Sequence, residues 1–526
     1  MCYSWVMSST TRFPKIPKEQ ITPLVAELLE LIHLQLEEIQ LLRDEIARLK
    51  NQKPRPKIKP SGLETTSNRG KTKKRKKRSQ KSKTKKIEIH EVISIKPDNL
   101  PAGSKLKDYQ EYIVQDLIIG NWNTCYRRQR WQTPSGEYVL GQLPEHVTGS
   151  HFGPTVTAFV LYQYYGCHVT QPLIKEQLHE LGVNISTGQI NNIIINNKDR
   201  FHDEKEQILS TGLKVSNYIN VDDTGARHDG QNGYCTHIGN EYFAWFKSTD
   251  SKSRINFLNL LRCGYSDFVL NDQALEYMAE QKLPEYQLPK LSCHKNKIFK
   301  NETRWINFLK RQKIKLERHK RIATEGALVG SISYHGFNPE LAIISDDAGQ
   351  FKVFLHGLCW VHAERTIQNI VGFNDHQNQL LEETKADVWQ FYRDLKKYRC
   401  NPEETQKHDL EVRFNTLFTR KTGFVTLDIT LKRIYRNKSE LLLVLKRPDI
   451  PLHNNLSERD IREYVKRRKV SGSTRSDMGK ECRDTFTSLK KTCRKLGISF
   501  WQYLQDRIEY KNKLPPLYEL METQLV

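Results

Sequence analysis

Apolar residues near the start of the chain recur at alternating intervals of four and three. Positions 21, 25, 28, 32, 39, 42, 46 and 49 hold Ile, Val, Leu, Ile, Ile, Leu, Ile and Leu, and position 35 holds Gln. This spacing predicts a coiled coil over residues 21–52, in which one polar residue such as Gln35 can fix the register. An amphipathic helix packed on its own domain is the alternative. We favour a homo-oligomer because Pro54, Pro56 and Pro60 separate the helix from the following chain.

Two helical patterns with a short turn between them cover residues 171–197. Gly182 ends the first helix, and Ser186 can cap the second. This helix-turn-helix plan directs polar residues outward toward a DNA groove, although many all-helical connections look alike. The apolar faces contain Ile174, Leu178 and Leu181 in the first helix and Ile190, Ile193 and Ile194 in the second, and the groove-facing candidates are Gln189, Asn191 and Asn192.

A region rich in aromatic residues precedes these helices. We expect a compact region to begin near Lys105. Its aromatic side chains alternate with Arg127, Arg128 and Arg130, so they can stack on bases, but such residues more often form core and surface packing. The aromatic residues are Tyr109, Tyr112, Trp122, Tyr126, Trp131 and Tyr138.

Extended segments follow over residues 218–221, 234–238 and 242–246, separated by turns at 229–230 and 239–240. Such a series predicts an antiparallel meander. The first segment leads into Asp222-Asp223-Thr224-Gly225, where we expect the strand to end in a glycine turn. We expect a helix from Ser253 to Leu261.

The second half of the chain is mostly helical, with one further buried strand. We interpret residues 262–340 as a Lys-rich insertion that is helical across 303–325. The strand at 341–345 leads into two aspartates, and helices follow to about Tyr398 and again over 402–447. Pro448 and Pro451 break this pattern ahead of the helix that carries Glu458. Strands and helices in this order predict a mixed α/β sheet core.

The charge of the chain points to a polyanionic partner. It contains 84 Lys and Arg against 61 Asp and Glu, a net charge of +23. Residues 69–86 alone hold twelve basic and no acidic side chains, which predicts a basic linker over 53–104. That linker can serve as a solvated spacer. It can also contact phosphates weakly through residues such as Lys73, Lys74 and Arg75, and the two roles are compatible. Nucleic acid is a better candidate than a membrane surface.

Two other features narrow the class of protein. No apolar run approaches the ~20 residues of a membrane span, and the N-terminus lacks the core of a signal peptide. The ten cysteines are scattered without a C-x-x-C pair. Reduced thiols in a cytoplasmic protein are therefore expected, and a sequence-encoded zinc ribbon is not.

Three acidic residues far apart in the sequence are candidates for one metal site. Asp222 and Asp346 each follow an apolar strand pattern, and Glu458 lies on a helix. Phosphodiester chemistry with Mg²⁺ needs hard oxygen ligands of this kind. Each residue also has an ordinary alternative, because the aspartates suit turns or helix caps and Glu458 can close a capping box with Asn455.

The motifs around these residues resemble a known family. They are Val221-Asp222-Asp223-Thr224-Gly225, then Asp346 followed by Cys359-Trp360-Val361-His362-Ala363-Glu364-Arg365, then Asn454-Asn455-Leu456-Ser457-Glu458-Arg459. In this order they resemble the IS66-type transposases of bacterial insertion sequences, DDE enzymes with a ribonuclease-H-like core. The resemblance covers roughly residues 150–510, and the predicted coiled coil agrees with the family's leucine zipper.

The chain departs from the family pattern in three respects. The family's D-E-T segment is D-D-T here, and its cysteine-rich zinc finger is missing, with only Cys125 in that region. The interval from Asp222 to Asp346 is long, which we attribute to the insertion at 262–340. That interval leaves Asp272 as a rival second ligand, and we prefer Asp346 because Cys359-Trp360 follows it at the family's distance.

The resemblance implies a metal-dependent reaction on DNA. Asp222, Asp346 and Glu458 would hold Mg²⁺, with Mn²⁺ as its substitute, for strand cleavage at the ends of the element and for attack of the freed 3′-hydroxyl on target DNA. The implied partners are terminal repeats, target DNA, a second copy of the chain and helper proteins of the element. Residues that contact phosphates, or form surface ion pairs instead, are His362, Arg365, Arg459 and Arg462; Cys359 and Trp360 are expected in the core.

Two other functions stay open at this point. One is a DNA-binding regulator without catalysis, and the other is a ribonuclease-H-like nuclease without strand transfer. The expected organisation is a coiled coil (21–52), a linker (53–104), a DNA-binding region with the helix-turn-helix (105–210), a catalytic domain (211–510) and a C-terminal tail (511–526).

Overall fold

The computed structural model describes Gln35 and residues 89–94, 114–115, 119–143 and 151–525. The predicted coiled coil, apart from Gln35, and the basic residues Lys73, Lys74 and Arg75 lie outside the described residues, so these expectations remain predictions.

A five-stranded mixed sheet is the centre of the fold, with strand order β5-β4-β3-β8-β9. The first three strands along the chain form the expected antiparallel meander, and β8 and β9 continue the sheet in parallel with β3. The strand predicted at 341–345 is therefore confirmed as a neighbour of the meander. The bounds are β3 (Tyr218–His228), β4 (Gln231–Gly239), β5 (Ala244–Thr249), β8 (Ala342–Ser345) and β9 (Leu355–Leu358).

Two expectations about the strands are wrong. Strand β3 does not end at Asp222-Asp223-Thr224-Gly225 but runs on to His228, because β4 pairs with it from Asn220 to His228. The reversal comes at Asp229-Gly230, whose φ angles of 43° and 74° suit the tight turn of a two-residue hairpin. Strand β9 replaces part of the helical region expected after Asp347, because its segment completes the parallel edge of the sheet.

Helices cover both faces of the sheet. Strand β8 is buried on both sides, with Ile343 in one hydrophobic core and Ile344 in the other, as alternation along a strand requires. Helices on the first side include α5 (Asp199–Val215) and α17 (Asp477–Lys495), and α16 (Asn455–Ser471) packs on β3 and β4. The second core surrounds Trp360 and is built from α11 (Trp360–Gln368), α12 (Asp375–Cys400), α13 (Glu404–Thr419), α14 (Val425–Arg436) and the short α15 (Lys438–Leu441).

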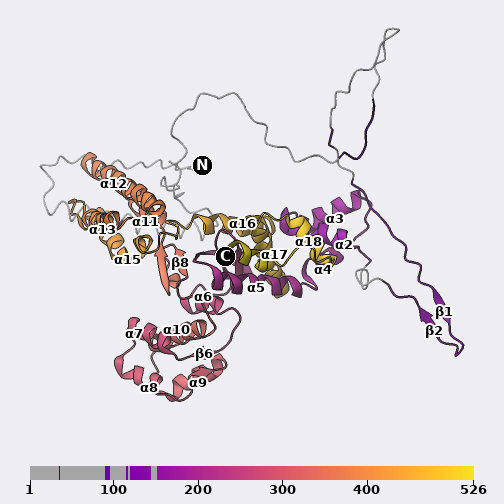
Figure 1. The fold of residues 1–526 in the computed structure, drawn as a ribbon, viewed down its shortest axis with the longest axis horizontal. Coiled ribbons are helices and arrows are strands. Elements are labelled where there is room, and N and C mark those ends of the chain that lie inside the picture. Colours follow the sequence, from indigo (N-terminus) through magenta and orange to yellow (C-terminus); the bar gives the residue numbers. More distant parts are fainter. Residues whose placement is uncertain (1–34, 36–88, 95–113, 116–118, 144–150, 526) are drawn as a thin grey trace, which may run out of the picture.

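The N-terminal helices and the C-terminal helices lie together at one end of the sheet (Figure 1). The two helices expected at 171–197 are present, and Ser186 accepts a hydrogen bond from Gln189 N as predicted for a cap. Residues 511–525 include a helix whose Leu517 and Met521 are buried against α5. These elements are α2 (Pro154–Leu161), α3 (Gln171–Glu180), α4 (Thr187–Ile195), α18 (Phe500–Ile508) and α19 (Leu517–Leu525).

The insertion between β5 and β8 forms a lobe that Figure 1 shows beside the sheet, joined to it through α6 (Arg254–Leu261). The single helix expected at 303–325 is two helices, because Lys313 takes a left-handed conformation (φ 59°) and Ile314 turns inward. The lobe contains β6 (Phe268–Val269), α7 (Asp272–Glu280), α8 (Leu288–Ser292), β7 (Ile298–Phe299), α9 (Glu302–Arg311) and α10 (Glu317–Tyr334).

The described part of the aromatic region differs from the compact region we expected. Residues 130–140 form a hairpin of β1 (Arg130–Gln132) and β2 (Tyr138–Leu140) that extends away from the rest of the protein (Figure 1). Trp122 and Trp131 are 93% and 68% exposed, so they are not core residues. The hairpin buries too little surface to pack against the body, because its strands are only three residues long.

Candidate active site

Asp222 lies on β3 and Asp346 directly follows the neighbouring strand β8, at the boundary between the antiparallel and parallel halves of the sheet. The parallel pairing of β3 with β8 includes Asn220 opposite Ile344. Each aspartate is two residues beyond that pair, on the same side of its strand. Two carboxylates that the sequence separates by more than a hundred residues are thus adjacent in the fold.

The electrostatic environment of Asp222 includes both of the other predicted carboxylates. Burial, followed by the negative charge of Asp346 and then those of Asp223 and Glu458, raises the pKa of Asp222 to about 7. A hydrogen bond from Asp223 N to Asp222 Oδ1 (2.8 Å) opposes this shift. Asp222, Asp346 and Glu458 therefore lie close enough for the charges of the other two to affect Asp222.

Glu458 reaches this region because α16 is attached to β3 at its first turn. Asn454 Nδ2 donates to Val221 O (2.7 Å), and Asn454 Oδ1 accepts from Asn220 Nδ2 (2.9 Å). Asn454 N also donates to Cys359 Sγ (3.1 Å). The helix begins after Asn454 and has no side-chain cap, so the capping-box alternative for Glu458 and Asn455 is wrong.

Helix α11 contributes two polar side chains beside Glu458. Arg365 Nη1 lies 3.3 Å from Glu458 Oε1 and 3.2 Å from His362 Nε2. Burial, and then the charge of Arg365, lowers the pKa of His362, so the imidazole is neutral at pH 7. Two buried nitrogens, His362 Nδ1 and Arg365 Nε, have no hydrogen-bond partner.

Three further aspartates have other structural roles. Asp223 accepts hydrogen bonds from Thr236 Oγ1 (2.5 Å) and Gln350 Nε2 (3.0 Å). Asp347 forms an exposed ion pair of 2.9 Å with Arg433. Asp272 is the first residue of α7 and follows β6, which is not a strand of the five-stranded sheet.

The chemistry of the site suits a hard divalent cation, although its ligands are not gathered into a closed group. Among the described residues, no three His, Cys, Asp or Glu side chains are close enough to hold a metal ion. Asp346 Oδ1 accepts a hydrogen bond from Ala348 N (3.1 Å), and Glu458 is engaged by Arg365. The donor set is nevertheless three carboxylates, and a cation would offset both the burial of Asp222 and the neighbouring negative charge that raise its pKa.

Several residues that position the site carry no signal in the sequence. His237 pairs with Asp222 across the β3–β4 ladder. Its Nδ1 lies 2.5 Å from Ser457 Oγ, next to Glu458, and its Nε2 lies 3.2 Å from Asp460 Oδ2. Asp460 in turn forms ion pairs with two lysines of α17, at 2.8 Å and 2.7 Å. Only the Asn454-Asn455 pair ahead of the helix could have indicated such an anchor.

The other predicted contacts with DNA are spread over two helices. Arg459 and Arg462 are exposed on α16. On α4, Asn192 is exposed, Gln189 is half-buried, and Asn191 accepts a hydrogen bond from Gln171 Nε2 (3.2 Å). Cys359 and Trp360 are buried, and Trp360 Nε1 donates to Leu441 O (2.9 Å), so the expectation that they belong to the core is confirmed.

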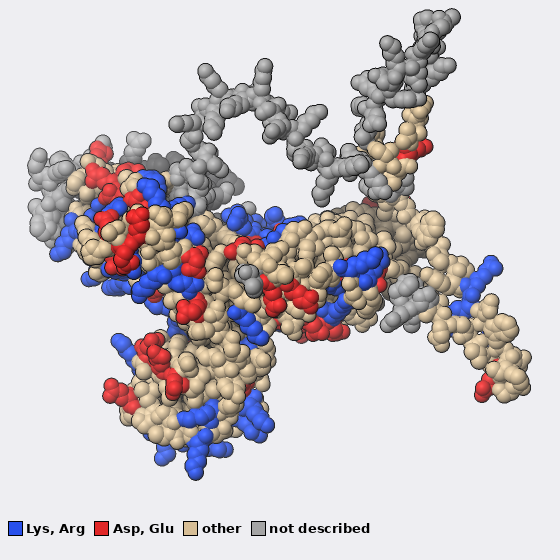
Figure 2. All heavy atoms as spheres, viewed as in Figure 1, with Lys and Arg blue, Asp and Glu red and all other residues tan. Residues whose placement is uncertain are grey.

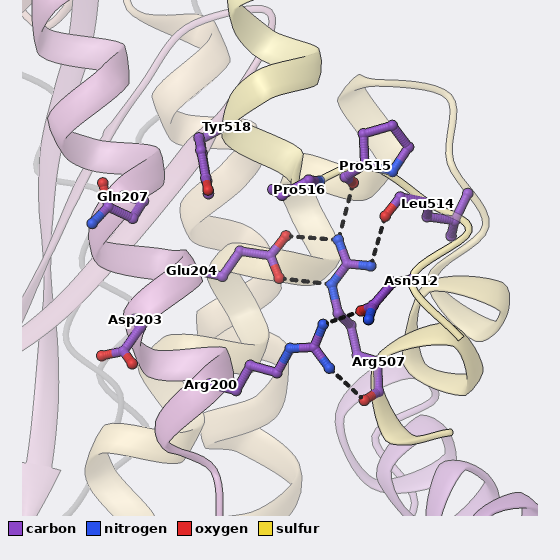
Figure 3. Close-up of a pocket in the computed structure, with 10 residues that line it drawn as sticks. All are labelled: Arg200, Asp203, Glu204, Gln207, Arg507, Asn512, Leu514, Pro515, Pro516 and Tyr518. Atoms are coloured by element: carbon purple, nitrogen blue, oxygen red, sulfur yellow. Dashed lines mark hydrogen bonds and ion pairs between the residues drawn. The ribbon is translucent and has the colours of Figure 1, made fainter. Parts of the chain in front are cut away.

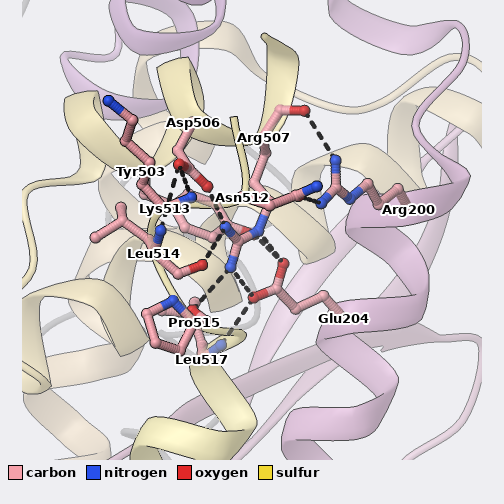
Figure 4. Close-up of polar contacts among 10 residues, drawn as sticks. All are labelled: Arg200, Glu204, Tyr503, Asp506, Arg507, Asn512, Lys513, Leu514, Pro515 and Leu517. Carbon is pink, nitrogen blue, oxygen red and sulfur yellow. Dashed lines mark hydrogen bonds and ion pairs between the residues drawn. The ribbon is translucent and has the colours of Figure 1, made fainter. Parts of the chain in front are cut away.

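A pocket of about 350 Å³ lies elsewhere, between α5 and the segment before α19 (Figure 3). None of the predicted site residues lines it. Its central Arg507 is fully engaged, by both carboxylate oxygens of Glu204 (3.0 and 3.1 Å), by Asp506 (2.6 Å) and by two carbonyl oxygens of the segment (Figure 4). This network anchors the C-terminal segment and occupies the guanidinium of Arg507.

The described cysteines are all free thiols. In the part of the chain that the structure describes, no helix is both long and apolar enough to cross a membrane.

The fold is mixed α/β, and acidic residues from a strand, from the end of a neighbouring strand and from a helix lie close together. This arrangement can be compared with that of known transposases. The family described as Transposase IS66 matches this chain over residues 334–482. An uncharacterized protein, y4jO of Sinorhizobium fredii (strain NBRC 101917 / NGR234), is 43% identical over 303 residues, which is 57% of this chain and 94% of that protein. The chain belongs to the IS66 family of transposases.

The family match includes part of the candidate site. Asp346, His362, Arg365 and Glu458 lie within the matched residues, and Asp222 and the inserted lobe up to Ser333 lie before them. The place of Asp222 in the site therefore rests on the geometry of the sheet.

Proposed function

We propose that this protein is a DDE transposase with a ribonuclease-H-like catalytic core. The observation that carries the proposal is geometric: Asp222 of β3 lies beside Asp346, which follows β8, and Asn454 joins the helix of Glu458 to β3. The sheet supports it, because three antiparallel strands followed by two parallel ones are the arrangement expected of such a core. Membership of the IS66 family supports transposase activity. The three carboxylates are the site where we propose that the reaction takes place.

Asp222, Asp346 and Glu458 would hold the metal, Mg²⁺ or in its place Mn²⁺. When bound, a pair of such ions activates the attacking oxygen and stabilises the leaving one. The protein's own contribution is to keep the carboxylates in place, through the β3–β8 register and the Asn454 bridge. Neutral His362 and the unpaired Nε of Arg365 can donate hydrogen bonds to a phosphate beside the carboxylates.

The reaction has two in-line displacements at phosphorus. In the first, a water oxygen forms a bond to the phosphorus at the end of the element, and the bond to the 3′-oxygen breaks, leaving a 3′-hydroxyl. In the second, that 3′-oxygen attacks a phosphodiester of target DNA, the bond to the target's own 3′-oxygen breaks, and the attacking hydroxyl loses its proton. One set of carboxylates serves both steps because both have the same geometry.

Other parts of the chain deliver the DNA. Gln189, Asn191 and Asn192 of α4 would read the terminal repeats as part of a helix-turn-helix, and Arg459 and Arg462 would contact phosphates. The basic linker, with Lys73, Lys74 and Arg75, would add affinity that does not depend on sequence. The coiled coil at 21–52 would pair two copies, so that two ends of an element are held together.

Mg²⁺-dependent nicking of a labelled fragment from the end of the element tests the proposal. We expect Asp222→Ala, Asp346→Ala and Glu458→Ala to lose cleavage and strand transfer together by orders of magnitude, while DNA binding persists. Asp223→Ala, Asp347→Ala and Asp272→Ala are the controls and should be milder, because their side chains are engaged elsewhere or lie outside the sheet.

The alternatives give different results in the same assay. If Asp272→Ala is inactive and Asp346→Ala is active, the second ligand is misassigned. If the unaltered protein binds the fragment but never nicks it with any metal, the protein is a regulator. Cut DNA without joined products identifies a nuclease.

A further inference from the structure

The charges of the inserted lobe are divided between its two sides. Residues 262–294 contain three Lys or Arg and five Asp or Glu, whereas residues 295–321 contain eleven Lys or Arg and two Asp or Glu. Figure 2 shows blue side chains gathered at the α9 side of the lobe and red ones toward α7. An insertion that merely needed to stay soluble would not require this segregation.

Helix α9 builds the basic side by burying one face and exposing the other. Trp305, Phe308 and Leu309 are at most 4% exposed. Trp305 stacks parallel to Phe268 of β6, with 5.6 Å between the ring centroids. The opposite face and the following connection are exposed. We call this surface the lobe basic face; it comprises Arg304, Lys310, Arg311, Lys313, Lys315 and Arg318.

The lobe basic face is not neutralised by the protein. Within the described residues, its six side chains form no ion pair, although the neighbouring Lys320 and Arg321 pair with Glu317 and Glu325. Six unpaired cations from residue 304 to 318 raise the free energy of the isolated protein by mutual repulsion. A polyanion that runs along α9 would remove this cost.

The lobe is fixed to the loop that carries Asp346. Arg254 of α6 donates to Tyr277 Oη (3.2 Å) within the lobe and lies 3.5 Å from the buried Glu325. Through its other terminal nitrogen it donates to Gly349 O (2.7 Å), three residues after Asp346. Arg254 therefore links the lobe to the loop that follows Asp346.

We propose that the lobe basic face binds the phosphate backbone of duplex DNA, as a contact separate from the helix-turn-helix and the basic linker. The proposal rests on the proposed function, in which DNA is the substrate. A ten-residue helix is about 15 Å long, which spans about four base pairs at 3.4 Å each, so about three phosphates of one strand lie within reach of α9. These contacts position DNA and read no sequence.

The test measures duplex binding by the full-length protein in EDTA, with a random-sequence probe of about 30 base pairs and a series of salt concentrations. The variant carries Arg304→Gln, Lys310→Gln and Arg311→Gln, three exposed positions where Gln keeps the helix propensity. The control carries Lys385→Gln, Lys397→Gln and Lys407→Gln. It changes the net charge equally, but these lysines are already paired with Glu382, Asp394 and Glu404.

We expect the slope of log K against log salt to become less steep by about 2 to 3 in the lobe variant and to stay unchanged in the control. An unchanged slope in the lobe variant overturns the proposal, and so does an equal fall in both variants, which would report net charge alone. Loss of binding to duplex RNA with an unchanged DNA slope would assign the face to RNA. Because nothing here depends on cleavage, a protein that never nicks DNA refutes the proposed function without affecting this result.

Discussion

Asn454 joins the helix of Glu458 to the strand of Asp222 through a single buried amide. Its Nδ2 donates to Val221 O at 2.7 Å, and its Oδ1 accepts from Asn220 Nδ2 at 2.9 Å. Asn454 is 1% exposed, so water cannot replace either bond. The relative position of two candidate ligands therefore depends on a residue that is itself no ligand.

Asn454→Ala should destabilise the protein by about 1–3 kcal/mol, because it leaves the buried Asn220 amide without its acceptor. Urea unfolding measures this change. Nicking should fall more than DNA binding, since Glu458 loses its anchor to β3. The matched control is Asn455→Ala at the next, half-buried position, which should cost less than about 1 kcal/mol. Equal losses for the two variants would contradict a specific role for the Asn454 bridge.

The pattern of apolar and capping residues predicted the helices and strands whose structure depends mainly on their own residues. Helices α3 and α4 have clear apolar faces, and Ser186 caps α4 as expected. The meander was also predictable, because Asp229-Gly230 is a strong turn signal. The adjacency of Asp222 and Asp346 could be predicted only from the resemblance to a family. The residues around each aspartate do not indicate which strand lies beside it in the sheet.

Other features depend on contacts that the sequence does not display. Strand β9 contains His356 and Gly357, which have little strand propensity. A Cβ at Gly357 would come within 2.8 Å of Ile344 Cδ1, so a larger residue would require the Ile344 side chain to move. Asp460 and Glu463 of α16 resemble surface residues, but lysines of α17 cover and neutralise them. The role of each residue is determined by a partner far along the chain.

Metal binding should offset the loss of folding stability that the negative charge of Asp222 causes. Its pKa is raised to about 7, so the folded protein binds a proton more tightly than the unfolded chain, and stability falls as pH rises from about 4 to 7. At pH 8 without metal, Asp222→Asn should therefore be more stable than the unaltered protein, on the order of 2 kcal/mol. Mg²⁺ should raise the melting temperature of the unaltered protein and have little effect on the variant. A variant less stable than the unaltered protein at pH 8 would contradict the assignment.

His356 should make the protein sensitive to acid. Burial lowers its pKa to about 4, and its Nδ1 has no hydrogen-bond partner. The unfolded chain binds the proton near pH 6.5, so stability is complete above that pH and is lost as pH falls toward 4. The expected loss at pH 5 is about 2 kcal/mol, measured by urea unfolding at pH 5 and 7.5. His356→Gln should remove this part of the pH dependence, whereas the exposed His376→Gln should leave it intact.

Glu204 and Arg507 should be energetically coupled, because both charges are buried and each satisfies the other. Arg507→Met leaves the Glu204 carboxylate buried with only Tyr503 Oη and Leu517 N as donors, and Glu204→Leu removes two of the hydrogen bonds of the buried guanidinium and leaves Asp506 as its carboxylate partner. Each single change should cost about 3–5 kcal/mol in urea unfolding, and the double variant clearly less than their sum. Arg200→Met is the control, since Arg200 is exposed and contacts Arg507 O, Asn512 Oδ1 and the ring of Tyr510; it should cost about 1 kcal/mol or less. Additive losses in the double variant would mean that the two residues act separately.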